Sequence, residues 1–89
     1  MTLTVWKYPL AFGSQTILMP QNARILAVQT QHNEPQLWAL VNPEAPDETR
    51  RFLTIGTGTE FEADRLLLDY IGTFQLHSGS LVFHLFECK

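Results

Sequence analysis

The stretch YIGTFQLHSGSLVFHLFE, Tyr70–Glu87, decides the fold of this 89-residue chain. It places two apolar-rich runs on either side of a Ser-Gly dipeptide, which is the pattern of a β-hairpin. Pairing around a Ser78-Gly79 turn sets Thr73 opposite His84 and gathers one dense apolar face: Phe74, Leu76, Leu81, Phe83 and Leu85. The segment therefore predicts two half-buried strands of an antiparallel sheet.

The register of this hairpin determines whether His77 and His84 form a site. With a Ser78-Gly79 turn they share a face but lie roughly 13 Å apart at ~3.3 Å per residue. Two imidazoles at that separation cannot ligate one metal ion. A turn at Gly79-Ser80 instead makes them diagonal neighbours, roughly 7–8 Å apart between Cα atoms, which suits a metal pair. Both registers are open, and a polar hairpin face without a metal is the favoured interpretation.

Short strand-like runs also fill the rest of the chain, and turn-forming residues separate them. They are TVWKYPL (Thr4–Leu10), QTILMP (Gln15–Pro20), RILAVQTQ (Arg24–Gln31), QLWALVN (Gln36–Asn42) and RRFLTIGTG (Arg50–Gly58). The segment FEADRLLLDY allows at most a short helical segment near residues 61–68. We therefore predict one all-β domain over residues 1–89, a small antiparallel barrel or sandwich of five to seven strands.

The middle hairpin contains the sequence HNEP between its two apolar runs. Taken as a four-residue loop, it places Gln31 opposite Gln36 and Val28 opposite Ala39. Strict alternation then predicts that Leu26 shares the face of Val28.

The composition argues against several classes of function. Hydrophobic residues make up 45% of the chain and charged residues 17%, with a net charge of −3 and only six scattered basic residues. Nucleic acid is therefore not an expected partner. The single cysteine, Cys88, excludes an intramolecular disulfide and a Cys-rich zinc site. No secretory signal pattern and no apolar run of the ~20 residues that span a bilayer is present, so we expect a cytoplasmic protein without membrane contact.

No combination of residues in the sequence forms a convincing catalytic group. The acids of EAPDE and EFEAD cluster in loops, and Cys88 stands next to the end of the chain. The serines occur outside any Gly-x-Ser-x-Gly elbow. We therefore predict a protein that is not an enzyme and that uses no cofactor or metal.

Two sets of residues are candidates for binding. Trp6 and Tyr8 alternate on the first strand, where Pro9 indicates a sheet edge or a strand end. Such aromatics either pack in the core or, where exposed, anchor protein partners. We therefore expect Trp6 and Tyr8 to contact a protein partner, with a homodimer formed through an edge strand as one form of that contact.

The second candidate set would bind a small anion. The GTG sequence supplies the backbone of Gly56 and Gly58, and Arg50 and Arg51 supply positive charge. Trp38 could stack on a base. This set predicts a pocket for a small anionic nucleotide.

Several segments together resemble a known family. They are KYPL, ILAVQ, LWALVNPEAP and YIGTFQLHSGSLVFHLFE, and they cover most of the 89 residues. They are similar to a family of short uncharacterised proteins encoded mainly by bacteriophages and prophages, a domain of unknown function. The resemblance implies expression inside an infected bacterium and supplies no catalytic residue.

These observations lead to two expectations about function. The first is a non-enzymatic phage accessory protein that binds a host or phage protein. The second is a sponge that sequesters a small anionic nucleotide signal, an analogy from gene context.

Overall fold

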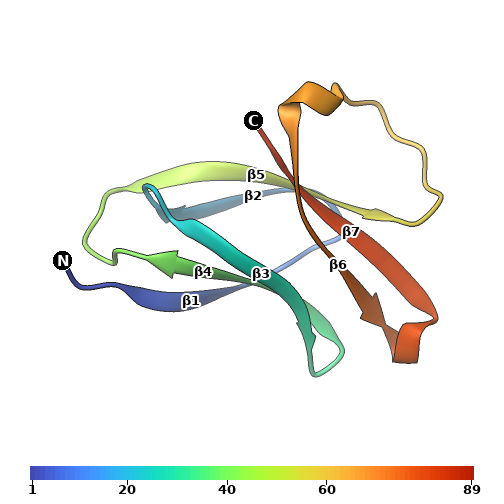
Figure 1. The fold of residues 1–89 in the computed structure, drawn as a ribbon, viewed down its shortest axis with the longest axis horizontal. Coiled ribbons are helices and arrows are strands. Elements are labelled where there is room, and N and C mark those ends of the chain that lie inside the picture. Colours follow the sequence, from blue (N-terminus) through green and yellow to red (C-terminus); the bar gives the residue numbers. More distant parts are fainter.

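The computed structural model describes residues 1–89, which form seven strands in two antiparallel sheets (Figure 1). Sheet A has the strand order β1 (Thr4–Pro9), β4 (Glu34–Val41), β3 (Arg24–Gln31). Sheet B has the order β2 (Gly13–Pro20), β5 (Asp47–Gly56), β7 (Leu81–Cys88), β6 (Leu68–Leu76). Two single-turn 3₁₀ helices, η1 (Arg65–Leu67) and η2 (His77–Gly79), complete the elements. The predicted small all-β fold is confirmed.

The two sheets meet along one side of the molecule, where β3 lies beside β6. The Thr30 hydroxyl donates to the Gln75 carbonyl at 2.7 Å across this junction. Gly72 allows the close approach, because a Cβ there would lie 2.8 Å from the Val28 Cγ1 atom. The opposite edges, β1 and β2, have no strand beside them. The fold is therefore a sandwich joined on one side and open on the other.

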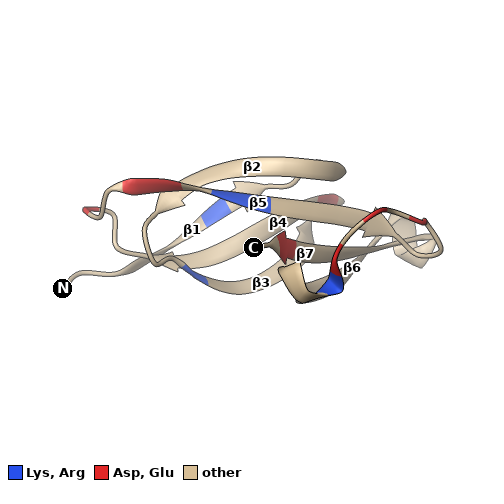
Figure 2. Cartoon of the chain, turned by 90° about the horizontal axis from the view of Figure 1, so that it is seen from above, with Lys and Arg blue, Asp and Glu red and all other residues tan.

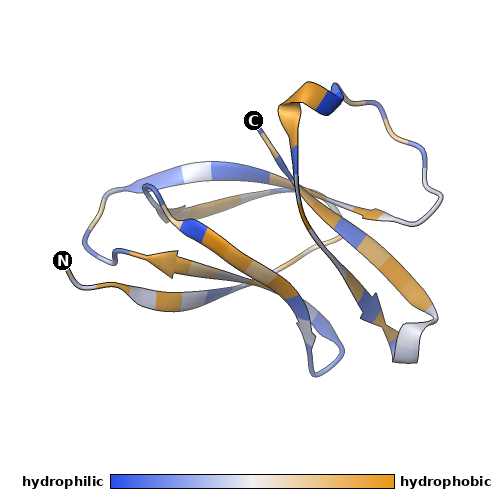
Figure 3. Ribbon diagram, viewed as in Figure 1, coloured by the Kyte–Doolittle hydropathy of each residue, from blue (hydrophilic) through white to orange (hydrophobic).

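The core lies between the inner faces of the sheets. Alternate residues of each strand point inward, and the buried apolar set is Leu10, Ile17, Met19, Ala23, Val28, Leu37, Ala39, Val41, Phe52, Phe74, Leu76 and Leu85. Apolar positions are frequent along β3, β4 and β7 (Figure 3). A core of this size covers only the inner faces, so much of each outer face stays accessible.

The final hairpin has the first of the two predicted registers. Thr73 lies opposite His84 and Leu76 opposite Leu81. The turn uses positive φ values at His77 (52°) and Ser78 (56°). His77 therefore sits at the tip while His84 lies within β7, and the alternative register with adjacent histidines is wrong.

The predicted four-residue loop of the middle hairpin is also wrong. Gln31 lies opposite Glu34 and Val28 opposite Leu37, so only His32 and Asn33 form the turn. Both have positive φ, 52° and 61°, as a two-residue hairpin turn of type I′ requires. Pro35 is tolerated within β4 because its backbone groups face away from β3. Its carbonyl accepts a hydrogen bond from Leu10 N–H on the β1 side, so the missing N–H costs the β3–β4 ladder no bond.

A bulge changes the predicted face of Leu26. The register shifts between Ile25 and Ala27, which places Ile25 opposite the buried Ala39. Leu26 is consequently exposed rather than sharing the core face with Val28.

The predicted helical segment near residues 61–68 is the single turn η1. Its N-cap, Asp64, accepts a hydrogen bond from Leu66 N–H through its side chain. No helix in the structure has the length and apolar character needed to cross a membrane.

Candidate functional site

The structure does not assemble the predicted anion site. Arg50 points toward the core side of β5 and holds Glu87 of β7 in a two-point ion pair, with Nε–Oε2 at 2.6 Å and Nη2–Oε1 at 2.7 Å. Its Nη1 also donates to the Ala23 carbonyl at 2.6 Å. The bond to Glu87 raises the pKa of Arg50. This guanidinium is therefore a structural link between sheet B and the β2–β3 turn.

The other members of that predicted site lie apart from Arg50. Arg51, the next residue, is exposed and points to the opposite face of the sheet. Gly56 and Gly58 lie near the far end of β5, roughly 20 Å from Arg50 at ~3.3 Å per residue. Trp38 belongs to sheet A. These five residues do not form one site.

Trp38 lies on the outer face of sheet A, close to the side chains of Lys7 and Gln36. The Lys7 Nζ atom lies 5.7 Å from the centroid of the Trp38 ring and donates to the Gln31 side chain at 2.7 Å. The Trp38 Nε1 atom and the Gln36 Oε1 atom are both buried without a hydrogen-bond partner. Lys7 thus covers this ring from the edge strand.

The structure places Trp6 and Tyr8 on β1, an edge strand as predicted. Both point to the core side, because they lie opposite the buried Ala39 and Leu37. Trp6 is 40% exposed and remains available to a partner. Tyr8 packs against the core, its hydroxyl lacks a hydrogen bond, and burial followed by the charge of Asp47 raises its pKa.

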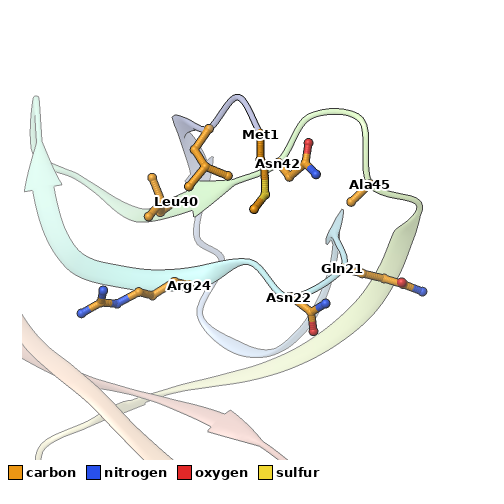
Figure 4. Close-up of a pocket in the computed structure, with 8 residues that line it drawn as sticks. Met1, Gln21, Asn22, Arg24, Leu40, Asn42 and Ala45 are labelled. Atoms are coloured by element: carbon orange, nitrogen blue, oxygen red, sulfur yellow. The ribbon is translucent and has the colours of Figure 1, made fainter.

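A pocket of about 310 Å³ lies at one end of sheet A. Its lining residues are Met1, Leu3, Gln21, Asn22, Arg24, Leu40, Asn42 and Ala45 (Figure 4). Figure 4 shows the side chains of Arg24 and Gln21 extending in opposite directions. The polar groups therefore surround the pocket without converging on one point inside it.

The outer face of sheet B carries an apolar band that the sequence analysis did not identify. One row of side chains crosses three strands, with Leu53 opposite Phe86 and Phe86 opposite Tyr70. Tyr70 is 60% exposed, and its ring lies 5.8 Å from that of Phe86. Phe61 lies over Phe86 at 6.3 Å and is itself exposed. We call Leu53, Tyr70, Phe86 and Phe61 the outer band.

A chain of hydrogen bonds borders the outer band. The Thr57 hydroxyl donates to the Val82 carbonyl and lies 2.7 Å from His84 Nε2. We assign the Thr57 proton to the Val82 carbonyl, so that Thr57 accepts from Nε2–H of His84. Nδ1 of His84, 2.9 Å from Thr73 Oγ1, then accepts from the Thr73 hydroxyl. Thr73 in turn bonds to the Tyr70 hydroxyl.

This hydroxyl–imidazole–hydroxyl order resembles a nucleophile with its base, but the third member is a neutral Thr73. A neutral hydroxyl does not stabilise an imidazolium as a carboxylate would. The chain therefore acts to fix the orientation of His84 and Tyr70 beside the outer band.

The loop between β5 and η1 brings negative charge to the same region. Glu60, Glu62 and Asp64 are exposed on both sides of Phe61. Figure 2 shows these acidic positions on the loop, which arcs away from the strands in Figure 1. The structure places no group of three or more His, Cys, Asp or Glu side chains where it could hold a metal ion. The region thus combines an apolar surface with an acidic border.

Comparison with protein families gives a match to a domain of unknown function, DUF7352, over residues 1–89. The chain belongs to this family. Comparison with curated proteins finds no match, and neither does comparison with solved structures. The DUF7352 assignment covers the whole chain and agrees with one structural unit formed by the two sheets.

Proposed function

We propose that this DUF7352 protein is a non-enzymatic binding protein that engages another protein through the outer band. The observation that carries the proposal is the row Leu53–Phe86–Tyr70 on an accessible sheet face, with Phe61 beside it. Aromatic side chains in the centre of a contact supply much of its binding energy, since each buries a large area at little entropic cost.

The chemistry around the outer band indicates the kind of partner. Glu60, Glu62 and Asp64 border it, so a partner with an apolar centre and basic residues at its rim would be complementary. The net charge of −3 favours the approach of such a basic surface.

The family resemblance supplies the proposed context. Its segments are similar to proteins of phages and prophages, and the function would then be that of an accessory protein acting in the cytoplasm of an infected bacterium. The partner is accordingly a host or phage protein.

The test is a comparison of captured partners between variants. A double variant, Phe61→Ala with Tyr70→Ala, removes the exposed aromatics of the outer band without touching the core. The matched control is Val5→Ala, an exposed apolar residue on the outer face of sheet A. Each protein is expressed in a bacterial host, crosslinked, and its partners are quantified by mass spectrometry.

The expected result is a stoichiometric partner that is retained by the wild type and Val5→Ala and lost from the double variant. Truncation of such hot-spot residues costs about 2 kcal/mol or more, which weakens binding at least roughly thirtyfold. A partner that the double variant retains at wild-type level would refute the assignment to this face.

A second candidate function is binding of a small anionic nucleotide. The pocket lined by Arg24 is its candidate site, because a guanidinium, amide side chains and an apolar wall border it, and Arg24 would have to turn toward the pocket to hold an anion. Thermal unfolding with a nucleotide panel tests it: binding raises the melting temperature of the wild type, and Arg24→Gln abolishes the rise.

A further inference from the structure

The two open edges of the sandwich differ in what their backbones offer. In an antiparallel ladder, residues bonded to the neighbour alternate with residues whose N–H and C=O point the other way. Leu10 N–H bonds to the Pro35 carbonyl, so with the observed register Tyr8, Trp6 and Thr4 face β4. The groups of Val5, Lys7 and Pro9 therefore face the free edge of β1.

The free edge of β1 is poorly suited to pairing with another strand. Pro9 lacks the N–H that would point outward, and Lys7 places a charge at the middle of the strand. Proline and lysine are both residues that protect natural sheet edges from added strands.

The free edge of β2 carries no charge, and its one proline, Pro20, stands at the last position of the strand, outside Ser14–Leu18. Gln21 N–H bonds to the Pro46 carbonyl, so Met19, Ile17, Gln15 and Gly13 face β5. The N–H and C=O groups of Ser14, Thr16 and Leu18 then point outward, and all three residues are exposed. Figure 2 shows β2 as an outermost strand without a charged position.

We propose that β2 pairs with β2 of a second copy of the chain, antiparallel and centred on Thr16. Paired residues of an antiparallel ladder point to the same face, so a two-fold axis must pass through one residue facing itself. Centring on Thr16 aligns Gly13 with Met19 and Ser14 with Leu18, so Ser14, Thr16 and Leu18 can each exchange both backbone bonds. Centring on Ile17 would instead align Ser14 with Pro20, which has no N–H.

The side chains support a second copy as the occupant. β2 contains no charged residue, so self-pairing creates no like-charge repulsion across the junction. Leu18 is 58% exposed, and the pairing sets it beside the small Ser14 of the other copy. Ser14 lies opposite Leu53, so Leu18 of one copy extends the outer band of the other.

The test uses the self-facing position. Thr16→Lys and Thr16→Glu each place like charges opposite one another in a homodimer, whereas an equimolar mixture of the two variants places opposite charges there. The control pair, Thr49→Lys and Thr49→Glu, carries the same charges on the outer face of β5, one strand in from the edge. Dimer dissociation constants are measured by sedimentation equilibrium, and one ¹⁵N-labelled partner lets native mass spectrometry identify heterodimers.

We expect a wild-type dimer, dimers of the Thr49 variants, and up to about fivefold weakening for each Thr16 variant alone, with heterodimers restored in the mixture. Thr16→Pro should also give a monomer with an unchanged circular dichroism spectrum, because the lost N–H points outward. A monomeric wild type, or Thr16 variants that dimerise like the wild type, would overturn the proposal.

This inference does not depend on the proposed function. A Phe61→Ala, Tyr70→Ala protein should still dimerise, since neither residue lies on β2.

Discussion

Removal of the Glu87 carboxylate should destabilise the protein more than any single change to an exposed charge. Glu87→Ala leaves the Arg50 guanidinium with the Ala23 carbonyl as its remaining protein partner. The side chains of the pair are 17% and 20% exposed, so the stranded charge stays largely shielded from water.

The exposure of the pair sets the magnitude. Breaking a fully buried pair costs about 3–5 kcal/mol, and an exposed pair contributes about 0–1 kcal/mol. With Arg50 and Glu87 about four-fifths buried, we expect Glu87→Ala to lower the free energy of unfolding by roughly 2–4 kcal/mol. An 89-residue domain has about 4–13 kcal/mol in total, so the loss is a large share.

Urea denaturation followed by circular dichroism measures this loss as a lower transition midpoint. The control is Asp69→Asn, which breaks the exposed Asp69–Lys89 pair of the same sheet and should cost about 0–1 kcal/mol. Arg50→Met combined with Glu87→Leu removes both charges and should recover much of the loss. Equal stability of Glu87→Ala and Asp69→Asn would refute the reasoning.

Four further changes test other parts of the structure. The pKa of Tyr8 is raised in the folded protein, so above pH 10 the unfolded chain loses its phenol proton first and the wild-type free energy of unfolding should fall as pH rises. Tyr8→Phe should remove this part of the pH dependence, which thermal melts compared between pH 8 and 11 measure. Gly72→Ala should cost about 1–3 kcal/mol in urea denaturation, because its Cβ meets Val28, and the cost should shrink in a Val28→Ala background. Ser78→Gly should raise the melting temperature, since it relieves a positive φ worth about 1 kcal/mol. The neutral His84 ring should carry its proton on Nε2, which ¹⁵N chemical shifts report, and equal occupancy of both tautomers would contradict the assigned hydrogen-bond chain.

The final hairpin could be predicted because its signals agree. Apolar alternation on both strands and the Ser-Gly dipeptide indicate the hairpin and its core face, while the choice between the two registers, settled as Thr73 opposite His84, comes from the structure. The loop of the middle hairpin was predicted as four residues because Pro35 was assigned to the loop. Its acceptable place in β4 depends on its N–H side facing away from β3, at the point where the pairing with β1 ends, a non-local fact that the local sequence does not contain.

The candidate surface was also hidden from local patterns. Leu53 and Phe86 lie far apart in the sequence and become neighbours only through the strand order β5–β7–β6. Arg50 and Arg51 are adjacent in the sequence and suggested one anion site, yet side-chain alternation along β5 places them on opposite faces of the sheet. The order in which distant strands pair therefore explains why the sequence suggested an anion site at Arg50 and Arg51 and did not indicate the outer band.

The two proposals have a joint consequence that follows from symmetry. A two-fold axis through Thr16 and perpendicular to sheet B leaves both outer bands on the same side of one continuous sheet. A partner that presents two or more copies of its epitope would then be held at two points, which strengthens binding without any new contact. Thr16→Lys should consequently weaken binding to an oligomeric partner far more than binding to its isolated subunit, while Phe61→Ala with Tyr70→Ala should weaken both. If Thr16→Lys weakened binding to the oligomeric partner and to its isolated subunit equally, dimer formation would not contribute to binding by the outer band.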